Sequence, residues 1–326
     1  MLARRTLCVL AVAASACGGR YGGHPREPRT VASAPSDLDR AALPYEILDA
    51  RTGRVVDRAT FWAAVASARA VCVGEEHSNP HHHWFQLEVV RQLAKQLPPG
   101  TRLALGLEMV QRPFQGILDD YAAKRIDAAS LQSRVGWEDR WGFDWGFYAP
   151  TIDAALGAGA SLIAMNAPRE LTKKIARKGL ANLAPDERAQ VPDLVLDDTE
   201  HRAWFDGVME GMGGAHGHAH GSPPQDSTHA NVEMPSAEDI YTVQVVWDET
   251  MADAAARWLA ATPSGHAILL AGNGHCHESA IVRRLERRGV GDVISLRPVL
   301  DTEGRVADAL VKPVNDYLVV LRPTGT

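Results

Sequence analysis

The 326-residue sequence has little cysteine, few aromatic residues and no excess of positive charge. Of its four cysteines only Cys72 and Cys276 fall in the part that we expect to fold, which excludes the disulfide framework of a small secreted domain. The net charge of -6 becomes about -8 once residues 1–16, with Arg4 and Arg5, are removed. This acidity, without any basic stripe, argues against a nucleic-acid-binding protein held by phosphate contacts.

The sequence also lacks a long hydrophobic run at its start. It opens with MLARRTLCVLAVAASACGG, where an apolar run of about ten residues is too short to span a membrane and is typical of an export signal. The tripeptide ASA before Cys17 is similar to a bacterial lipoprotein cleavage box, although leucine is more common at its first position. We therefore expect residues 1–16 to be a signal peptide and Cys17 to be lipidated, with a plain secretory signal as the alternative. Residues 17–42, rich in glycine, proline, serine and charge, predict a flexible exported tether.

Short apolar runs alternate with helical patterns from residue 70 onward. Runs this short and continuously apolar predict strands that are covered on both faces. We therefore expect residues 43–326 to form an α/β domain, with a mostly parallel sheet and helices on both faces. The clearest helix is residues 236–260, whose apolar residues recur every three or four positions. The expected strands are residues 70–74, 102–108, 161–166, 266–272, 292–297 and 316–321.

Polar residues stand at the carboxyl ends of four of these runs. Glu76 and His77 follow the first run, Glu108 ends the second, Asn166 ends the third and His275 follows the fourth. Because the carboxyl ends of parallel strands meet at one edge of a sheet, we expect one ligand site there. The tetrapeptides GEEH and GNGH share the pattern Gly-x-x-His, in which glycine permits a tight turn that aims the imidazole over the sheet.

These residue types allow more than one kind of site. The imidazoles of His77 and His275, with Glu76 or Glu108, could hold a divalent metal ion, and a free carboxylate could take a proton from bound water. The same groups could instead ligate iron or hold haem propionates, or simply form hydrogen-bonded turns. Of the three histidines that follow, only His81 shares the face of His77, so His82 and His83 are expected to be surface or packing residues.

An aromatic segment, WEDRWGFDWGFYAP, contains three of the eight tryptophans. It predicts a large apolar surface near the same edge, suited to a flat ligand or to a core. Tyr148 in this segment could bind ferric iron through its phenolate. Cys72 and Cys276 are interpreted as small buried thiols, with a redox or ligand role for Cys276 as the alternative.

Residues 211–232 have glycine, proline and four histidines but no residue large enough to anchor a core, which predicts a mobile surface loop. His216, His218 and His220 could bind a metal ion weakly from this loop, or the loop has no role.

Six segments closely resemble the ChaN-like haem-binding uptake lipoproteins of the Tiki superfamily: in chain order, GEEHSNPHHHWFQL, LGLEMVQRPFQ, WGFDWGFYAP, LIAMNAPREL, VQVVWDETMA and AGNGH. The resemblance implies an α/β domain, a lipidated protein of the bacterial cell envelope, and haem binding connected with iron acquisition. Carried over by position, Glu76, His77, Glu108 and His275 are the pocket residues of the superfamily pattern, and Tyr148 falls in the aromatic stretch of the haem-binding branch. Similar paired motifs occur in metal-dependent proteases and erythromycin-esterase-like hydrolases of the wider superfamily.

Three functional hypotheses follow from the residues and the resemblance. The first is an exported lipoprotein, facing the periplasm or held at the outer membrane, that binds haem through Tyr148, His77 or His275 with Asn166 nearby. The second is a hydrolase that holds a metal ion with His77, His275 and Glu108 or Glu76. The third is metal storage by the histidine-rich loop. The sequence leaves open the transport partners, and whether haem binds to one chain or between two chains of a homodimer.

Overall fold

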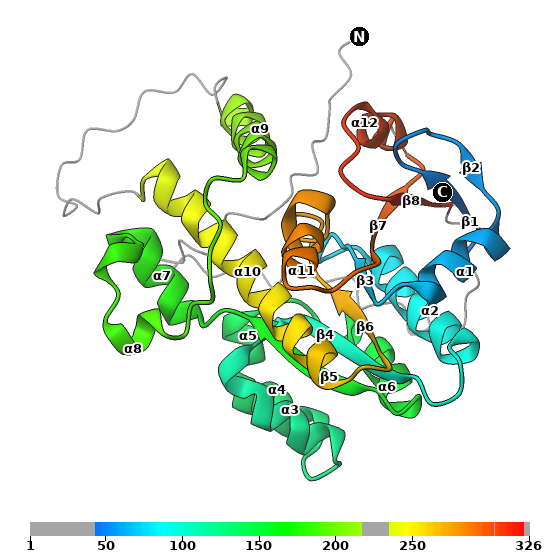
Figure 1. The fold of residues 1–326 in the computed structure, drawn as a ribbon, viewed down its shortest axis with the longest axis horizontal. Helices are drawn as coiled ribbons and strands as arrows, with labels where there is room; N and C mark the ends of the chain where they lie inside the picture. The colour runs from blue at the N-terminus through cyan, green and yellow to red at the C-terminus, as the bar shows by residue number, and fades with distance from the viewer. Residues whose placement is uncertain (1–42, 217–234, 303, 323–326) are drawn as a thin grey trace, which may run out of the picture. The chain divides into compact units, whose positions relative to one another are not determined.

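A computed structural model describes residues 43–216, 235–302 and 304–322 of the chain (Figure 1). Its strands form one eight-stranded sheet in the order β2-β1-β8-β7-β3-β6-β4-β5. The strands of the described residues are β1 Tyr45–Asp49, β2 Val55–Val56, β3 Ala70–Val73, β4 Arg102–Gln111, β5 Ser161–Asn166, β6 Gly265–Leu270, β7 Val293–Leu300 and β8 Tyr317–Leu321.

The six strands β3 to β8 run parallel to one another, and β1 and β2 pair antiparallel at one edge. All six strands expected from the sequence are therefore confirmed, as is the α/β class. The two antiparallel strands were not predicted, because β1 interrupts its apolar residues with Glu46 and Asp49, and β2 has only two residues.

The helices agree with the capping signals in the sequence. Asn79 caps α2, since its side chain accepts a hydrogen bond from the backbone of His81, and Pro80 takes the first helical position. The α-helices are α1 Arg58–Ser67, α2 Pro80–Gln96, α3 Gln115–Ala122, α4 Ala128–Val135, α5 Trp137–Arg140, α6 Ala149–Gly157, α7 Arg169–Lys178, α8 Pro185–Arg188, α9 Thr199–His216, α10 Ala237–Ala261, α11 Arg283–Arg287 and α12 Arg305–Val311.

One loop prediction is wrong in part. Helix α9 continues to His216, so residues 211–216 are helical rather than loop. The remainder of the predicted histidine-rich loop, with His218 and His220, lies in residues 217–234, outside the described residues.

The chain divides into two compact units, which are described separately. Among the described residues, one unit comprises residues 170–216 and 235–246, and the other comprises residues 43–169, 247–302 and 304–322. The first unit has a small apolar cluster in which Phe205 of α9 packs with Tyr241 and Val245 of α10. The second unit contains the whole sheet. None of the helices in the described residues is long and apolar enough to cross a membrane.

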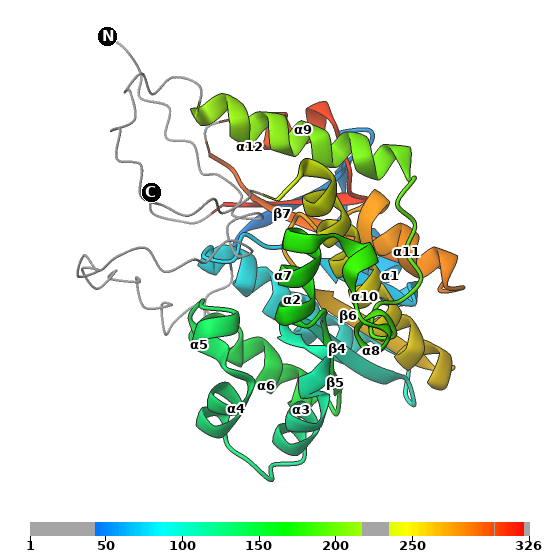
Figure 2. The same cartoon turned by 90° about the vertical axis from the view of Figure 1, so that its left-hand side faces the viewer.

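Helices α2 and α11 of the second unit lie on opposite faces of the sheet (Figure 2). Strand residues alternate between two apolar clusters, one on each face. Val71 and Val73 of β3 join Phe85 of α2 in one cluster. Cys72 joins Leu285 of α11 and Met251 of α10 in the other. This alternation is the two-residue period of a strand that is buried on both faces.

The order of β3 and β6 determines where a ligand can bind. These two strands are neighbours, yet β3 leads into α2 on one face and β6 leads into residues 278–287 on the other. At such a switch point the two connections leave the sheet in opposite directions, which is where open α/β sheets bind their ligands. Both Gly-x-x-His turns begin at this point of the fold.

Candidate functional site

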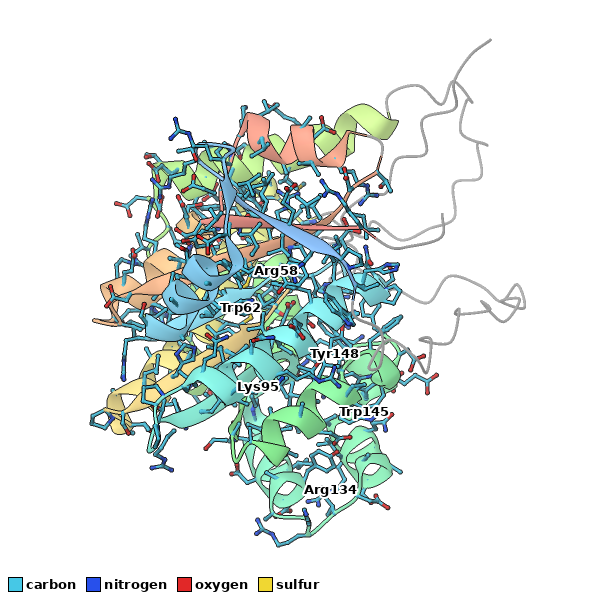
Figure 3. The ribbon with its side chains drawn as sticks, turned by 90° about the vertical axis from the view of Figure 1, so that its right-hand side faces the viewer. Arg58, Trp62, Lys95, Arg134, Trp145 and Tyr148 are labelled. Carbon is cyan, nitrogen blue, oxygen red and sulfur yellow. A yellow bond between two sulfur atoms is a disulfide. The ribbon has the colours of Figure 1, made fainter. Side chains whose placement is uncertain are left out.

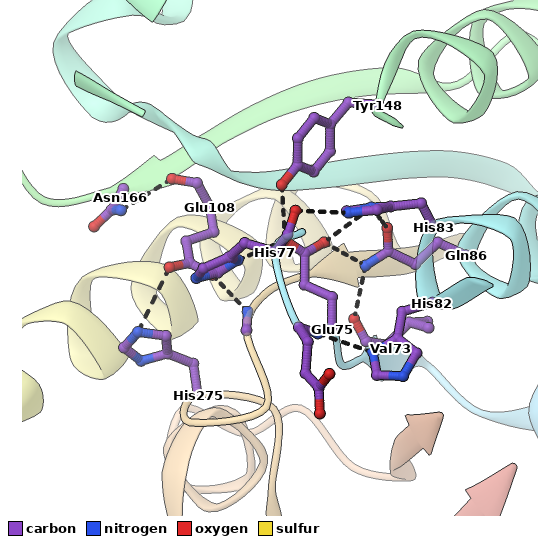
Figure 4. A network of polar contacts seen from close by, with 12 residues as sticks. Val73, Glu75, His77, His82, His83, Gln86, Glu108, Tyr148, Asn166 and His275 are labelled. Carbon is purple, nitrogen blue, oxygen red and sulfur yellow. Dashed lines mark hydrogen bonds and ion pairs between the residues drawn. The ribbon is translucent and has the colours of Figure 1, made fainter. Parts of the chain in front are cut away.

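His77 lies just beyond β3, and a buried carboxylate fixes its imidazole (Figure 4). Its Nδ1 is 2.7 Å from Oε1 of Glu75. Because an ionised carboxylate only accepts hydrogen bonds, Nδ1 carries the proton and the neutral ring has its lone pair on Nε2. Within the part of the chain that the structure describes, Nε2 has no hydrogen-bond partner, and 17% of the side chain is exposed. This is the arrangement of an imidazole oriented to bind an iron or another metal.

Glu75 is the centre of the buried network that orients His77. Its Oε1 also accepts a hydrogen bond from the Tyr148 hydroxyl at 2.9 Å, and its Oε2 accepts one from Nε2 of Gln86 at 2.7 Å. Nδ1 of His83 lies 3.5 Å from Oε2. Burial raises the pKa of Glu75, but the charges and hydrogen bonds of His83, His77 and Gln86 outweigh it and lower the pKa to about 2. Glu75 therefore stays ionised at neutral pH.

Glu108 connects the two Gly-x-x-His turns. Its Oε2 accepts a hydrogen bond from the backbone of Gly272 at 2.6 Å, and its Oε1 lies 3.5 Å from Nε2 of His275. Gly272 in turn packs against His77 so closely that a Cβ there would lie 2.9 Å from Cε1 of the imidazole. The structure therefore brings His77, Glu108 and His275 together, and only glycine fits at position 272.

His275 has a buried carboxylate of its own. Its Nδ1 is 2.6 Å from Oδ1 of Asp248 in α10, and Asp248 is fully buried. Burial lowers the pKa of His275, but the charges of Glu108 and Asp248 outweigh it and raise the pKa above its ordinary value. We call Glu75, His77, Glu108, Asp248 and His275 the paired-histidine site.

Two of these five residues were missed as site residues from the sequence. Glu75 was named only as part of the turn, because nothing in GEEH tells which of two adjacent carboxylates faces inward. Asp248 was counted as part of an amphipathic helix. The sequence signal that could have identified Asp248 is its position beside the apolar face of residues 236–260, between Trp247 and Met251.

Two aromatic residues flank His77. Its ring centroid lies 4.7 Å from that of Trp141 and 4.9 Å from that of Phe143. Both belong to the aromatic segment that was expected near this edge of the sheet. Other members of the segment, such as Trp137 and Phe147, are buried in the core cluster, so part of the segment forms core, and its use as a ligand surface stays a prediction.

Tyr148 is buried and forms a hydrogen bond with Glu75. Tyr148 directly precedes α6 (Figure 3). Its ring packs against that of His83 in α2, and its side chain is fully buried. Its hydroxyl donates to Glu75, and burial together with the negative charge of Glu75 raises its pKa well above the ordinary value. Phenolate ligation of iron by Tyr148 would require its hydroxyl to leave Glu75, and it stays an untested prediction.

Glu76 and Asn166 each have partners of their own, and the pocket roles expected for them stay predictions. Oε1 of Glu76 forms an ion pair with Arg305 at 3.0 Å. Asn166 donates a hydrogen bond to the backbone carbonyl of Glu108 at 2.9 Å, so it supports the strand that carries Glu108. That strand does not end at Glu108 but runs on to Gln111 with an irregular register.

His82 and His83 are buried packing residues, which is one of the two roles expected for them, because α2 packs this turn against the sheet. Cys72 and Cys276 form a disulfide rather than two thiols. Among residues 43–216, 235–302 and 304–322, no group of three or more histidine, cysteine, aspartate or glutamate side chains is arranged to hold a metal ion.

The buried His82 predicts sensitivity to acid. Burial, followed by the charge of His83, lowers its pKa to about 3. The folded protein thus binds fewer protons than the unfolded chain between about pH 6.5 and pH 3, so stability falls as the pH falls, by about 1.4 kcal/mol per pH unit for this group. A His82→Gln variant should lose that part of the slope in urea denaturation at pH 6, 5 and 4. Identical slopes for both proteins would contradict the assignment.

The fold and the site together define an α/β protein with two carboxylate-oriented histidines at the switch point of a parallel sheet. A family model described as haem-binding uptake, Tiki superfamily, ChaN matches residues 61–285, which is more than half of the chain. The chain therefore belongs to this family. No curated protein matches it.

Three solved structures are similar over most of the chain. One, described as "Cofacial heme binding to ChaN of Campylobacter jejuni", has a TM-score of 0.62 and 16% sequence identity, over 86% of this chain and 97% of that one. The type III effector HopBA1 has a TM-score of 0.36 and 14% identity, over 82% and 93% of the two chains. An erythromycin esterase mutant in its open conformation has a TM-score of 0.42 and 13% identity, over 87% and 83%. The first likeness supports the fold, and the other two are too low to support any conclusion.

Proposed function

We propose that this protein binds haem at the paired-histidine site and serves the uptake of haem or iron. The observation that carries the proposal is the imidazole of His77, whose Nδ1 is held by Glu75 while Nε2 has no hydrogen-bond partner among the described residues. His77 would hold the haem iron through Nε2, since haem iron binds imidazole nitrogen. The Campylobacter jejuni protein is described as binding haem, and so is the family, which supports the same ligand here.

The residues around His77 fit a flat, largely apolar ligand. Trp141 and Phe143 provide ring surfaces at its sides, and Glu75 keeps the proton on the nitrogen that faces the protein. Glu108 and Asp248 place negative charge beside His275. In this arrangement His77 is the ligand, Glu75 orients it, and Tyr148 and Gln86 hold Glu75 in place.

A hemin titration tests the proposal. Purified protein should give a saturable shift of the Soret band, and Trp141→Ala should weaken binding about tenfold because it removes a large ring surface. Tyr148→Phe should keep the wild-type Soret position, since the buried hydroxyl is used in the hydrogen bond to Glu75. Absence of a saturable shift in the wild-type protein would remove the proposal.

Export to an oxidising compartment belongs to the same proposal. A disulfide such as Cys72–Cys276 persists outside the cytosol and is rare within it, which supports an exported protein. Cys17 lies outside the described residues, so lipidation stays a prediction. A Cys17→Ala variant should move from the membrane fraction to the soluble fraction of the cell envelope, and an unchanged membrane fraction would argue against a lipid anchor.

A metal-dependent hydrolase is the second candidate function. It is favoured by His275, whose Nδ1 is held by Asp248 while Glu108 stands 3.5 Å from Nε2, because hydrolases use such carboxylate–histidine pairs around a metal or a reacting water. Elemental analysis of freshly isolated protein, with peptide and ester substrates for the wild type and Glu108→Gln, tests this function. Metal-free protein with no activity would remove it.

A further inference from the structure

The Cys72–Cys276 disulfide joins the two halves of the paired-histidine site. Cys72 lies in β3, which leads to Glu75 and His77, and Cys276 directly follows His275. Their Cα atoms are 5.5 Å apart although 204 positions separate them in the sequence. Both residues are fully buried, in the apolar cluster on the α10 and α11 face of the sheet.

The turn at residues 272–276 has to be held accurately for His275 to function. Nδ1 of His275 lies 2.6 Å from Asp248, and its Nε2 lies 3.5 Å from Glu108. The backbone of Asn273 donates to the carbonyl of Glu75 at 2.9 Å, which is a second link between the two halves. A covalent bond one residue after His275 restricts the imidazole far more than a hydrogen bond of the backbone does.

We propose that this disulfide is a positioning element: it holds the turn that carries His275, so that the paired-histidine site is complete only in the oxidised chain. The proposal concerns the same site as the proposed function and rests on it, but the measurement that tests it, proton NMR of the two histidines, does not involve haem. It also implies a partner class, since the bond has to be made by oxidation.

The oxidation is a thiol–disulfide exchange. One cysteine thiolate of the chain attacks the disulfide of an oxidoreductase, which releases the partner's first thiolate and gives a mixed disulfide. The chain's second thiolate then attacks the sulfur of the first cysteine in that mixed disulfide and expels the partner's second thiolate. The two electrons pass to the partner, which leaves as a dithiol with the two protons. Because both cysteines are buried in the folded chain, this exchange has to occur before the fold closes.

Proton NMR of the hydrogen-bonded imidazoles tests the positioning role. The Nδ1 proton of His275, shared with Asp248, and that of His77, shared with Glu75, should each give a downfield signal, assigned with His275→Gln and His77→Gln. In a Cys72→Ala/Cys276→Ala variant the His275 signal should disappear while the His77 signal remains. A Cys72→Val/Cys276→Ala variant, which restores core volume, should show the same result if the first variant does not fold.

Val282→Ala is the matched control, because it opens the same apolar cluster without touching the disulfide, and it should keep both signals. Retention of both signals in the folded double-cysteine variant would overturn the proposal, as would loss of both. A wild-type protein that shows both signals but fails to bind hemin would contradict the proposed function and leave the positioning role intact.

Discussion

Replacing Glu75 with alanine should lower the free energy of unfolding by about 3 kcal/mol or more, because it removes one partner from a buried and charged network. The carboxylate accepts hydrogen bonds from Tyr148, Gln86 and His77. Without it the buried Tyr148 hydroxyl would lose its acceptor, and Gln86 would keep only a longer contact of 3.4 Å to the carbonyl of Val73. Urea denaturation at pH 7 measures the loss.

The neighbouring glutamate is the control for this experiment. Glu76 has the same side chain, but its ion pair with Arg305 is partly exposed, with 30% and 28% of the two side chains accessible. Glu76→Ala should therefore cost only about 0–1 kcal/mol. Similar losses for the two variants would show that Glu75 has no special role.

The affinity for hemin should decrease as the pH falls through the pKa of His77. Burial lowers this pKa, but the hydrogen bond and charge of Glu75 and the charge of Glu108 outweigh it, so the pKa lies above its ordinary value. Protonated imidazole has no lone pair for iron. Below that pKa the affinity of the site should therefore fall about tenfold for each pH unit.

A Glu75→Gln variant distinguishes protonation of His77 from acid denaturation of the protein as the cause of weaker hemin binding. Glutamine keeps the shape of the side chain but removes the charge that favours protonated His77, so the inflection should move to lower pH. Loss of the orienting carboxylate should also weaken binding at high pH by about 10- to 100-fold. Hemin titrations between pH 6 and pH 9 measure both effects, and a flat profile in the wild type, or an unmoved inflection in the variant, would contradict the assignment.

The sheet could be predicted from the sequence because its strands are buried on both faces. Runs such as SLIAMN at residues 161–166 are continuously apolar and end at polar residues, which fixes both their type and their limits. β1 gives no such signal, since two of its five residues are acidic and interrupt the apolar run.

The site could be predicted only to the level of its position in the fold. His77, Glu108 and His275 were expected at one edge of a parallel sheet, and the structure brings them together. The direction of each side chain could not be predicted, because Glu75 and Glu76 are adjacent in a turn and face opposite ways. The hydrogen bond of Tyr148 could not be predicted for the same reason, because it depends on where the Glu75 carboxylate lies, and no local sequence pattern gives that position.

The disulfide could not be predicted from the spacing of the cysteines in the sequence. Cys72 and Cys276 are 204 positions apart, and only the pairing of β3 with β6 shows that they meet. Two isolated cysteines in a long chain are equally consistent with buried thiols.

The most direct test of the central claim is a hemin titration of His77→Ala beside His81→Ala. Both variants remove an imidazole from the same short segment, but only His77 is oriented by Glu75 and flanked by Trp141 and Phe143. We predict that His77→Ala lowers the affinity by about 100-fold or more and changes the Soret position, whereas His81→Ala binds like the wild type. Equal affinity and identical spectra for His77→Ala and the wild type would contradict the account.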